Sequence, residues 1–473
     1  MSKLLNSYLQ NFHYTIPKGF MNDIQTIWQD DDGLFHVYYL ANDIYLQNSG
    51  ATEWFHVTTR DFLKFDNQGV AIPRNINGWE AVATGSIIKN DTLFFTSLPK
   101  TALIAYFTSF THEGQKQFVV YSTDNGYHFN PLFDGPVLES SHFEEVYRDP
   151  FITLHDDKLL MYLTRGDFIE VLESTDGASF RRISTINFEK IYQHKYGILE
   201  CPVIVDFNKA MNSSYVLFFA GNQLDYGGTF ETYYVVGDLN TQGIFEPTQK
   251  PEKLDHGCDY YGVNFGKRAD TDNIVLGWLG NWEYSQKDIF DANGERPERL
   301  GSFALARKMT LESKNSISKL VQEIIMPPVS STLLSEKKYE IIKKILLTMS
   351  PLPHGIKEGN RLIKISIASA DSNFDITINK NENTIGIERQ SERVIDESAK
   401  KAYQRQVEAN LSQDSNVEDI KIIIDKSVVE IVVSPDQILT FLNYSTDNYC
   451  VITINDENQH NINDKFNLQS LTI

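Results

Sequence analysis

The sequence of 473 residues contains only three cysteines, Cys201, Cys258 and Cys450. None forms a Cys-x-x-Cys pair, which argues against a zinc site and against a thiol redox motif. No apolar run reaches the length of a membrane-spanning helix. The first residues, MSKLLNSYLQNFHYTIP, hold no apolar stretch long enough for a signal peptide. We therefore expect a cytoplasmic protein that has no membrane partner.

Positive charge is also scarce, because 43 Lys and Arg residues face 63 Asp and Glu residues, which gives a net charge of −20. Such a charge disfavours nucleic acids and anionic membrane surfaces as partners, and leaves a neutral small substrate open. Long helical patterns are rare, whereas runs rich in Val, Ile, Phe and Tyr recur along the chain. This pattern predicts an all-β protein, and the length allows two domains.

Four short segments in the first part of the chain resemble one another: HVTTRDFLKF, VYSTDNGYHF, LESTDGASFR and VVGDLNTQGIF. Each combines a strand-like approach, an aspartate, a turn and an aromatic residue. The aspartates are Asp61, Asp124, Asp176 and Asp238, and they recur at intervals of about 50 to 60 residues, close to the length of one four-stranded propeller blade. Aspartate suits such turns because its side chain accepts hydrogen bonds from nearby backbone N–H groups.

A second unit, a strand followed by a polar turn and another strand, occurs five times between these segments. The copies are IQTIWQDDDGLFHVYYL, GSIIKNDTLFFTS, PFITLHDDKLLMYLTR, PVIVDFNKAMNSSYVLFFA and GVNFGKRADTDNIVLGWLG. Five copies predict a five-bladed β-propeller in which the first strand of each pair is innermost.

Polar residues precede each predicted inner strand. They are Asn22 with Asp23, Thr84 beside Gly85 and Ser86, Arg148 with Asp149, Glu200 with Cys201, and Asp259 with Tyr260. Because inner strands run parallel to one axis, equivalent positions at their starts converge on one mouth of the central channel. We therefore expect Asp23, Asp149 and Glu200 to share a pocket there. Clustered carboxylates repel one another, which favours a functional reason for keeping them.

Two carboxyl groups that face a neutral, hydroxyl-rich substrate suggest hydrolysis of a glycosidic bond. One group must be ionised to attack the anomeric carbon and the other protonated to assist the leaving oxygen, and repulsion between them separates their pKa values. A metal site is the rival use of three acids. No histidine accompanies them at ligand spacing and Arg148 adjoins Asp149, so we expect neither a metal nor another cofactor.

Three motifs, GFMNDIQT (19–26), YRDP (147–150) and LECP (199–202), resemble the signature motifs of glycoside hydrolase family 32, which contains invertases, levanases and inulinases. ATGS (83–86) and GWLGNW (277–282) also look like segments of that family. The resemblance covers the whole chain, because the family joins a five-bladed propeller to a C-terminal β-sandwich.

The resemblance implies a retaining reaction on a fructose-containing carbohydrate. It makes Asp23 the nucleophile, Glu200 the general acid/base and Asp149 the transition-state stabiliser, with about 5–5.5 Å between the two main carboxyl groups. The candidates for binding the sugar ring are Asn22, Thr84, Ser86, Arg148, Asp259, Tyr260 and Trp278.

The sequence departs from the commonest family pattern around the nucleophile. Phe20 replaces a tryptophan, and Ile24, Gln25 and Thr26 follow the aspartate. Leu40 stands where many sucrose-cleaving members carry a glutamine, and a leucine cannot make that hydrogen bond. Four of these changes, Phe20, Ile24, Gln25 and Leu40, are expected at the rim of the pocket and favour levan-type fructans over sucrose.

Beyond residue 335 the segments RLIKISIAS, NFDITINK, TIGIERQ, IKIIIDKSVVEIVV and QILTFLNYS alternate with turns, as β-sandwich strands do. We therefore expect a catalytic propeller over residues 1–320 and a β-sandwich without its own chemistry over residues 335–473. A fructosyltransferase or an intracellular invertase on the same scaffold remains an alternative, and a fructan-binding protein is the non-enzymatic one. A fructan-binding protein without activity would be expected to lack one of the acids, and all three are present.

Overall fold

The computed structural model describes residues 10–43, 51–74, 81–92, 94–111, 114–140, 145–207, 215–267, 273–286, 289, 297–314, 317–333, 341–342, 344–349, 362–411, 420–456, 458 and 466–471. β-Strands make up most of the regular structure in these residues, with short helices such as α1 (Phe188–Tyr192) and α2 (Glu397–Tyr403) between them. None of the helices in these ranges is both long and apolar enough to span a membrane.

The described residues between Gly19 and Ile324 form five sheets, each with an inner strand from which the others follow outwards. The inner strands are β1 (Gly19–Gln29), β5 (Ala81–Lys89), β10 (Arg148–His155), β14 (Ile198–Asp206) and β19 (Tyr261–Lys267). Their antiparallel neighbours are β2 (Phe35–Asn42), β6 (Leu103–Thr111), β11 (Lys158–Arg165), β15 (Tyr215–Asn222) and β20 (Asn273–Leu279).

The outer strands complete each sheet. They are β3 (Glu53–Thr59) and β4 (Asp66–Ile72); β7 (Gly114–Ser122), β8 (Asn130–Pro131) and β9 (Leu138–Glu139); β12 (Phe168–Ser174) and β13 (Arg181–Ile186); β16 (Phe230–Leu239), β17 (Phe245–Pro247) and β18 (Glu252–Lys253); and β22 (Ser302–Phe303), β23 (Arg307–Lys314) and β24 (Ile317–Ile324).

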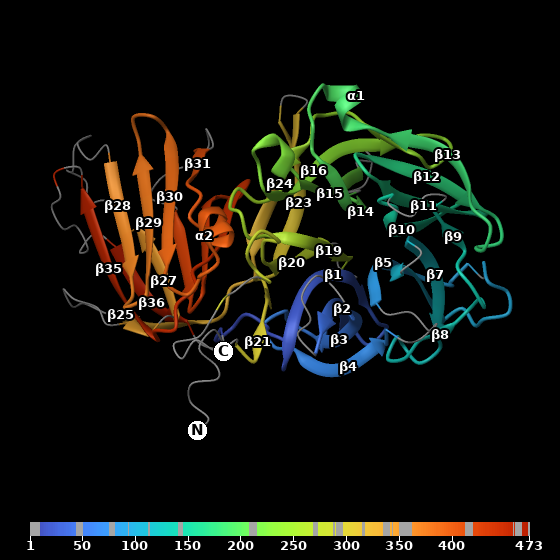
Figure 1. Ribbon diagram of the computed structural model, residues 1–473, viewed down its shortest axis with the longest axis horizontal. Coiled ribbons are helices and arrows are strands. Elements are labelled where there is room, and N and C mark those ends of the chain that lie inside the picture. Colours follow the sequence, from blue (N-terminus) through green and yellow to red (C-terminus); the bar gives the residue numbers. More distant parts are fainter. Residues whose placement is uncertain are drawn as a thin grey trace.

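The five inner strands close into a ring. Each packs against the inner strands of the next and the previous sheet, and β19 packs against β1. The closure is reinforced by β21 (Arg299–Leu300), which follows the fifth inner strand in the chain and pairs in parallel with β1 of the first sheet. Figure 1 shows these sheets, coloured blue to yellow, around a common centre. The sequence therefore correctly predicted a propeller, and the sheets match the predicted strand pairs in number.

Several propeller strands are buried on both faces, because each sheet packs between two neighbours. Every residue of β2 and of β20 is buried, although a strand at a surface would alternate. The continuous apolar runs in the sequence are therefore explained by the arrangement of the sheets.

The repeated aspartates stabilise turns, with one exception. Asp61, Asp124 and Asp176 each accept hydrogen bonds of 2.7 to 3.0 Å from backbone N–H groups two to four residues later. The assignment of Asp238 to this role is wrong, because Asp238 lies inside β16, opposite Glu246. Asn240 takes the turn position and accepts from N–H groups at 2.9 and 3.1 Å.

The second unit is a sandwich of two six-stranded sheets, drawn in orange and red in Figure 1. One sheet contains β25 (Val329–Leu333), β36 (Phe466–Leu471), β27 (Lys344–Met349), β32 (Lys421–Asp425), β33 (Val428–Ser434) and β34 (Gln437–Leu442). The other contains β26 (Ile341–Ile342), β35 (Tyr449–Asp456), β28 (Leu362–Ala368), β29 (Ser372–Asn379), β30 (Thr384–Ser391) and β31 (Val407–Asn410). Strand β29 alternates between buried and half-buried residues, since one of its faces covers the core.

The strands change from the ring to the sandwich between Ile324 and Val329. The expected domain limits were residues 320 and 335. The ring extends further because β24 pairs along its length with β23, and the sandwich begins earlier because β25 pairs with β36.

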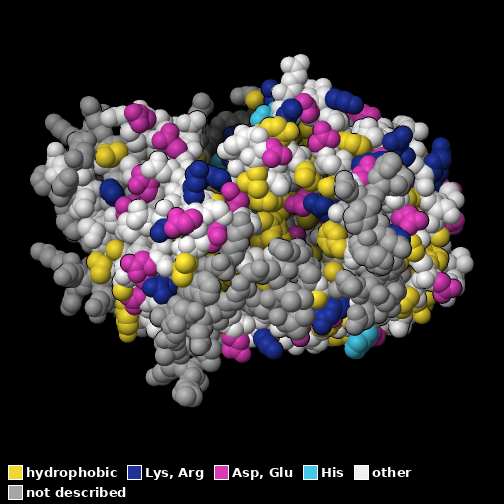
Figure 2. Space-filling model, viewed as in Figure 1, with side chains coloured by type: hydrophobic (Ala, Val, Ile, Leu, Met, Phe, Trp, Pro, Cys, Tyr) yellow, Lys and Arg dark blue, Asp and Glu magenta, His cyan; other side chains and the backbone are white. Residues whose placement is uncertain are grey.

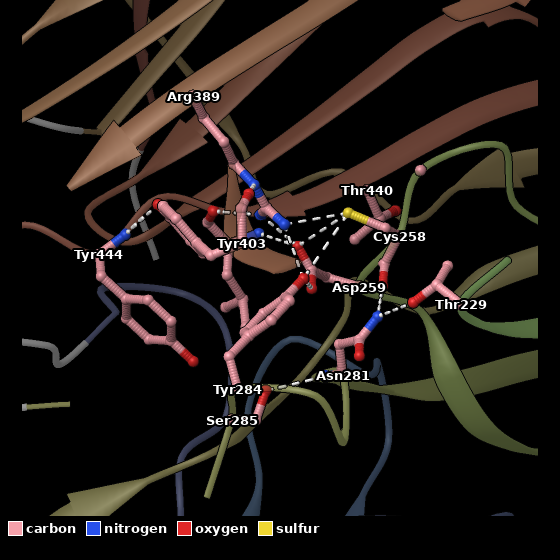
Figure 3. Close-up of polar contacts among 12 residues, drawn as sticks. Thr229, Cys258, Asp259, Asn281, Tyr284, Ser285, Arg389, Tyr403, Thr440 and Tyr444 are labelled. Carbon is pink, nitrogen blue, oxygen red and sulfur yellow. Dashed lines mark hydrogen bonds and ion pairs between the residues drawn. The ribbon is translucent and has the colours of Figure 1, made fainter. Parts of the chain in front are cut away.

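A buried ion pair joins the two units (Figure 3). Arg389 of β30 donates to Asp259, just before β19, at 2.5 Å and to the hydroxyl of Tyr284 at 2.6 Å. The same guanidinium donates to the backbone carbonyls of Leu442 and Tyr403. With its charge paired and its N–H groups bonded, Arg389 fixes the sandwich against the fifth sheet.

Candidate active site

A β-bulge interrupts each of the five inner strands at an equivalent position. The register shifts lie between Met21 and Ile24, Val82 and Gly85, Arg148 and Phe151, Glu200 and Val203, and Tyr261 and Asn264. A bulge turns the side chains beside it away from the sheet and bends the strand, which suits the mouth of a ring. The five bulges therefore present one short segment from each sheet at the same end of the channel.

The backbone at three of these bulges has a positive φ: 66° at Asp149, 51° at Cys201 and 51° at Gly262. Such a conformation is costly for a residue with a side chain, so the surrounding structure must hold it. At Asp149 the backbone N–H donates to the Thr108 hydroxyl at 2.9 Å, and the carbonyl of Arg148 accepts from Thr164 at 2.7 Å. The second sheet and strand β11 thus hold the acid in position.

A cavity of about 270 Å³ lies at these bulges. Its lining comes from all five sheets or their connections and contains three acids, one arginine, small polar groups and an apolar wall: Asn22, Asp23, Leu40, Thr52, Ala83, Thr84, Phe110, Arg148, Asp149, Glu200, Cys201, Phe230 and Trp282. Figure 2 shows hydrophobic side chains beside acidic and basic ones near the middle of the face in view. The cavity brings together Asp23, Asp149 and Glu200, as the repeat predicted.

Glu200 is held by two donors. Arg148 donates to Oε1 at 2.5 Å, and the hydroxyl of Tyr261 donates to Oε2 at 2.5 Å. Tyr261 is buried, which leaves its phenol no access to bulk water. One donor comes from the third sheet and the other from the fifth, so the carboxylate of the fourth sheet is fixed from both sides.

Asp149 is held by the fourth sheet and by its neighbour in sequence. Its Oδ2 accepts from the backbone N–H of Cys201 at 3.0 Å and lies 3.8 Å from Nε of Arg148. Burial raises the pKa of Asp149 to about 6; the arginine opposes this shift, and Glu200 adds to it. Arg148 therefore favours ionisation of Asp149.

Asp23 has a different environment. Its Oδ1 is buried without a hydrogen-bond partner in the protein, and so is Oδ1 of the neighbouring Asn22. Burial raises the pKa of Asp23 to about 8, with Glu200 and Asp149 adding to the shift by repulsion. Gly262 packs against it so closely that a Cβ there would lie 2.2 Å from Oδ1. The fifth bulge therefore needs glycine to leave room for this carboxyl group.

Four predicted binding residues do not line the cavity. Ser86 donates to the carbonyl of Pro150 at 2.9 Å and so ties β5 to β10. Tyr260 is buried beneath the guanidinium of Arg307, which lies 3.9 Å from its ring centroid, and Asp259 belongs to the ion pair with Arg389. Trp278 is fully buried and packs against the ring of Trp282 at 4.8 Å, so it supports the cavity wall from behind.

The misplacement of Asp259 and Tyr260 has a single cause. Strand β19 begins at Tyr261, and its bulge falls after that residue. Tyr261 and Gly262 are therefore equivalent to Arg148 and Asp149, and the predicted pair lies two residues too early. The motif DYYG contains both tyrosines, and the glycine after the second marks the bulge.

The predicted rim is also partly wrong. Phe20 is buried edge-on against Trp278, with centroids 5.9 Å apart, and Ile24 lies in the core of the first sheet. Gln25 is fully buried and accepts from the N–H of Gly85 at 3.0 Å, which links the first two sheets. Leu40 does line the cavity, so one of the four rim changes remains relevant to substrate choice.

Sequence reasoning missed Tyr261 and the apolar wall formed by Phe110, Phe230 and Trp282. Trp282 could have been found, because it ends the GWLGNW segment in which Trp278 was chosen. Phe110 and Phe230 follow no motif and come into the cavity only through the packing of strands. Within the described part of the chain, no group of three or more His, Cys, Asp or Glu side chains could hold a metal ion.

The family described as "Glycosyl hydrolases family 32 N-terminal domain" matches residues 13–323. A levanbiose-producing levanase from Bacillus subtilis strain 168 is 28% identical over 336 residues, which are 68% of this chain and 62% of the levanase. Invertase 2 from Saccharomyces cerevisiae is 29% identical over 318 residues, which are 64% of this chain and 58% of the invertase. The alignments therefore span less than two thirds of the length of either relative.

Solved structures share the fold along almost the whole chain. An exo-inulinase from Aspergillus awamori superposes with a TM-score of 0.79 at 18% identity, covering 98% of both chains. A fructofuranosidase from Schwanniomyces occidentalis complexed with fructose superposes with a TM-score of 0.77 at 20% identity, covering 100% of both chains. The predicted fold, a β-propeller followed by a β-sandwich, is confirmed.

Proposed function

The chain belongs to family 32 of the glycosyl hydrolases, and we propose that it hydrolyses β-fructofuranosidic bonds in fructans or fructo-oligosaccharides, with levan-type linkages preferred. The observation that carries this proposal is the meeting of Asp23, Asp149 and Glu200 in one cavity. Oδ1 of Asn22 and Oδ1 of Asp23 are buried acceptors without a donor in the protein, and the hydroxyls of a bound sugar can donate hydrogen bonds to them. Such bonds are favourable because a buried acceptor without a donor is costly.

The proposed reaction proceeds with retention through a covalent intermediate. Asp23 attacks the anomeric carbon while Glu200 gives its proton to the departing glycosidic oxygen, which leaves a fructosyl ester on Asp23. Glu200, now ionised, takes a proton from a water molecule, whose oxygen attacks the anomeric carbon and releases Asp23. Asp149 accepts hydrogen bonds from the fructosyl hydroxyls, and Arg148 keeps it charged.

Proton placement is a specific requirement of this proposal. With a pKa raised to about 8, Asp23 carries a proton at neutral pH, yet it must be ionised to attack. The general acid needs the same proton. The productive form is therefore the one in which the proton of the cluster lies on Glu200 and Asp23 is ionised, and substrate hydroxyls that donate to Asp23 favour this form.

The levan preference rests on Leu40, which brings an apolar side chain to the cavity wall where a hydrogen-bonding group would serve sucrose. A levanase and an invertase are similarly related to this chain, so the preference is proposed from the cavity and not from ancestry. A sucrose kcat/KM above that for both levan- and inulin-type oligomers would show that the protein is an invertase instead.

The test of the reaction is a Glu200→Ala variant assayed on a natural fructoside and on a fructoside with a good leaving group. We expect a loss of about 10²–10⁴-fold on the natural substrate, and recovery by azide when the leaving group needs no acid. Azide then replaces water as the nucleophile and yields a fructosyl azide. Wild-type rates in this variant would remove Glu200 from the mechanism. Products of sugar transfer at high substrate concentration would favour a fructosyltransferase.

A further inference from the structure

A second hollow, here called the fourth-sheet groove, has a volume of about 470 Å³ and is larger than the catalytic cavity. It lies between the connection that leads into β14, the connection between β15 and β16, and the edge strand β18. Its lining residues are His194, Tyr196, Gln223, Tyr226, Gly227, Gly228, Glu231, Tyr233, Pro251 and Lys253. None of these residues has a role in the proposed reaction.

The groove lies at the same end of the sheet as the catalytic cavity. Ile198 at the start of β14 pairs with Asn222 at the end of β15, and Asn222 pairs with Phe230 at the start of β16. Phe230 lines the catalytic cavity and the next residue, Glu231, lines the groove. Because successive side chains of a strand point to opposite faces, the first two residues of β16 separate the two hollows.

Aromatic rings form much of the groove. The ring of Tyr196 lies edge-on to that of Tyr233 at 4.9 Å and to the imidazole of His194 at 4.6 Å. Tyr226 is 52% exposed, and the ammonium of Lys195 lies 5.1 Å from its ring centroid, which orients the ring. Tyr196 and Tyr233 are buried and form the floor, whereas the open ring of Tyr226 offers flat apolar area, with a polar tip, to the C–H face of a sugar.

The polar groups of the groove form a fixed chain. Gln223 donates to the hydroxyl of Tyr233 at 2.5 Å, Tyr233 donates to Glu231, and Lys253 donates to the other oxygen of Glu231 at 2.5 Å. The carboxylate of Glu231 and the ammonium of Lys253 therefore neutralise each other. A groove without a net charge at its polar centre fits a neutral hydroxyl-rich ligand better than a phosphate or a cation.

We propose that the fourth-sheet groove binds distal fructosyl units of an oligosaccharide whose terminal unit occupies the catalytic cavity. This inference rests on the proposed function for the identity of the sugar. It predicts that kcat/KM increases with substrate length until the chain reaches the groove, and that the increase depends on the exposed ring of Tyr226.

The test is a Tyr226→Ala variant assayed on levan-type oligosaccharides of increasing length. The matched control is Tyr449→Ala, which removes a tyrosine that is 46% exposed on the sandwich strand β35. We expect Tyr226→Ala to lower kcat/KM by about 2- to 10-fold for long chains, the size of one aromatic contact, and to leave the shortest substrate unaffected. Tyr449→Ala should match the wild type at every length.

A second measurement separates this inference from the proposed function. Levan oligosaccharides are titrated calorimetrically into the Asp23→Asn variant with and without Tyr226→Ala. Weaker binding of long but not short chains in the double variant supports the groove. Equal affinities in the two variants, or equal losses at all lengths, overturn it. If the wild type cleaves no fructoside but the length-dependent binding is present, the proposed function fails and the groove stands.

Discussion

Tyr261 donates a 2.5 Å hydrogen bond to Glu200 across the boundary between the fifth and the fourth sheets. Tyr261 holds the same position in its inner strand as Arg148 and Glu200 hold in theirs, immediately before the bulge. Equivalent positions of three sheets therefore supply an acid and both of its side-chain donors. The geometry follows from the ring, because residues at equivalent points of neighbouring inner strands face one another.

Replacing Tyr261 by phenylalanine should lower kcat by about 10- to 100-fold, because its hydroxyl donates to the carboxylate that Glu200 becomes once it has given its proton to the leaving oxygen. KM should change little, because the hydroxyl contacts Glu200 and not the sugar. The control is Tyr260→Phe, since the Tyr260 hydroxyl is buried without a partner. Steady-state kinetics give kcat for both variants. If kcat of Tyr261→Phe equals that of Tyr260→Phe, the hydroxyl of Tyr261 does not contribute and the residue acts only through packing.

The Asp23→Asn variant should gain thermal stability relative to the wild type as the pH rises. The folded state raises the pKa of Asp23 from 3.8 to about 8, so folding favours its protonated form. Asp23 therefore lowers the stability of the fold at high pH. This destabilisation is absent below about pH 4, grows between about pH 4 and pH 8, and is constant above about pH 8. Between these values the carboxyl group ionises in the unfolded chain but stays protonated in the folded one. Asparagine does not ionise, so it has no such pH-dependent effect on stability.

Melting temperatures from pH 5 to pH 8 test this prediction, with about 1–2 °C expected for each kcal/mol regained in a chain of this length. Asp238→Asn, at an exposed carboxyl group of β16, is the control. A stability difference between the Asp23→Asn variant and the wild type that does not change with pH would contradict the prediction.

Replacing Leu40 by glutamine should raise kcat/KM for sucrose by about 2- to 10-fold relative to levan oligosaccharides, the worth of one ordinary hydrogen bond. Leu40 lines the catalytic cavity, so an amide there can reach a bound sugar. Leu40→Met is the control, because it keeps the apolar character. Parallel assays on the two substrates measure the ratio, and an unchanged ratio would remove Leu40 from substrate choice.

Replacing Arg389 by methionine should destabilise the fold by about 3–5 kcal/mol, because the charge of Asp259 would remain buried and unpaired. Adding Asp259→Asn should recover part of the loss. Chemical unfolding of the two single variants and the double variant gives the coupling energy. Additive losses in the double variant would mean that the two side chains do not act as a pair.

Sequence patterns were reliable where one local rule decides the outcome. The continuous apolar runs of the first half identified the inner strands, because each sheet is covered on both faces. The acids Asp23, Asp149 and Glu200 were found because they precede those strands in a repeating pattern. Asp61, Asp124 and Asp176 were assigned to turns because aspartate bonds its own backbone there.

The sequence failed where pairing partners decide the position. Asp238 and Asn240 both suit a turn, and only the pairing of β16 with β17 leaves Asn240 at the corner. Similarly, Asp259 and Tyr260 precede an apolar run as the other acids do. The register of β19 on β20 moves the equivalent position to Tyr261.

The sequence by itself thus determined the order of strands, the sandwich that follows the ring and the three acids that meet at the mouth. The tertiary structure alone decided which aromatic residues form the cavity wall, that Asp259 is neutralised by Arg389 of the other unit, and that Tyr261 holds Glu200. The reason is physical. Strand formation and turns depend on neighbours in sequence, whereas burial, pairing of charges and the direction of a side chain at a bulge depend on residues that only folding brings near.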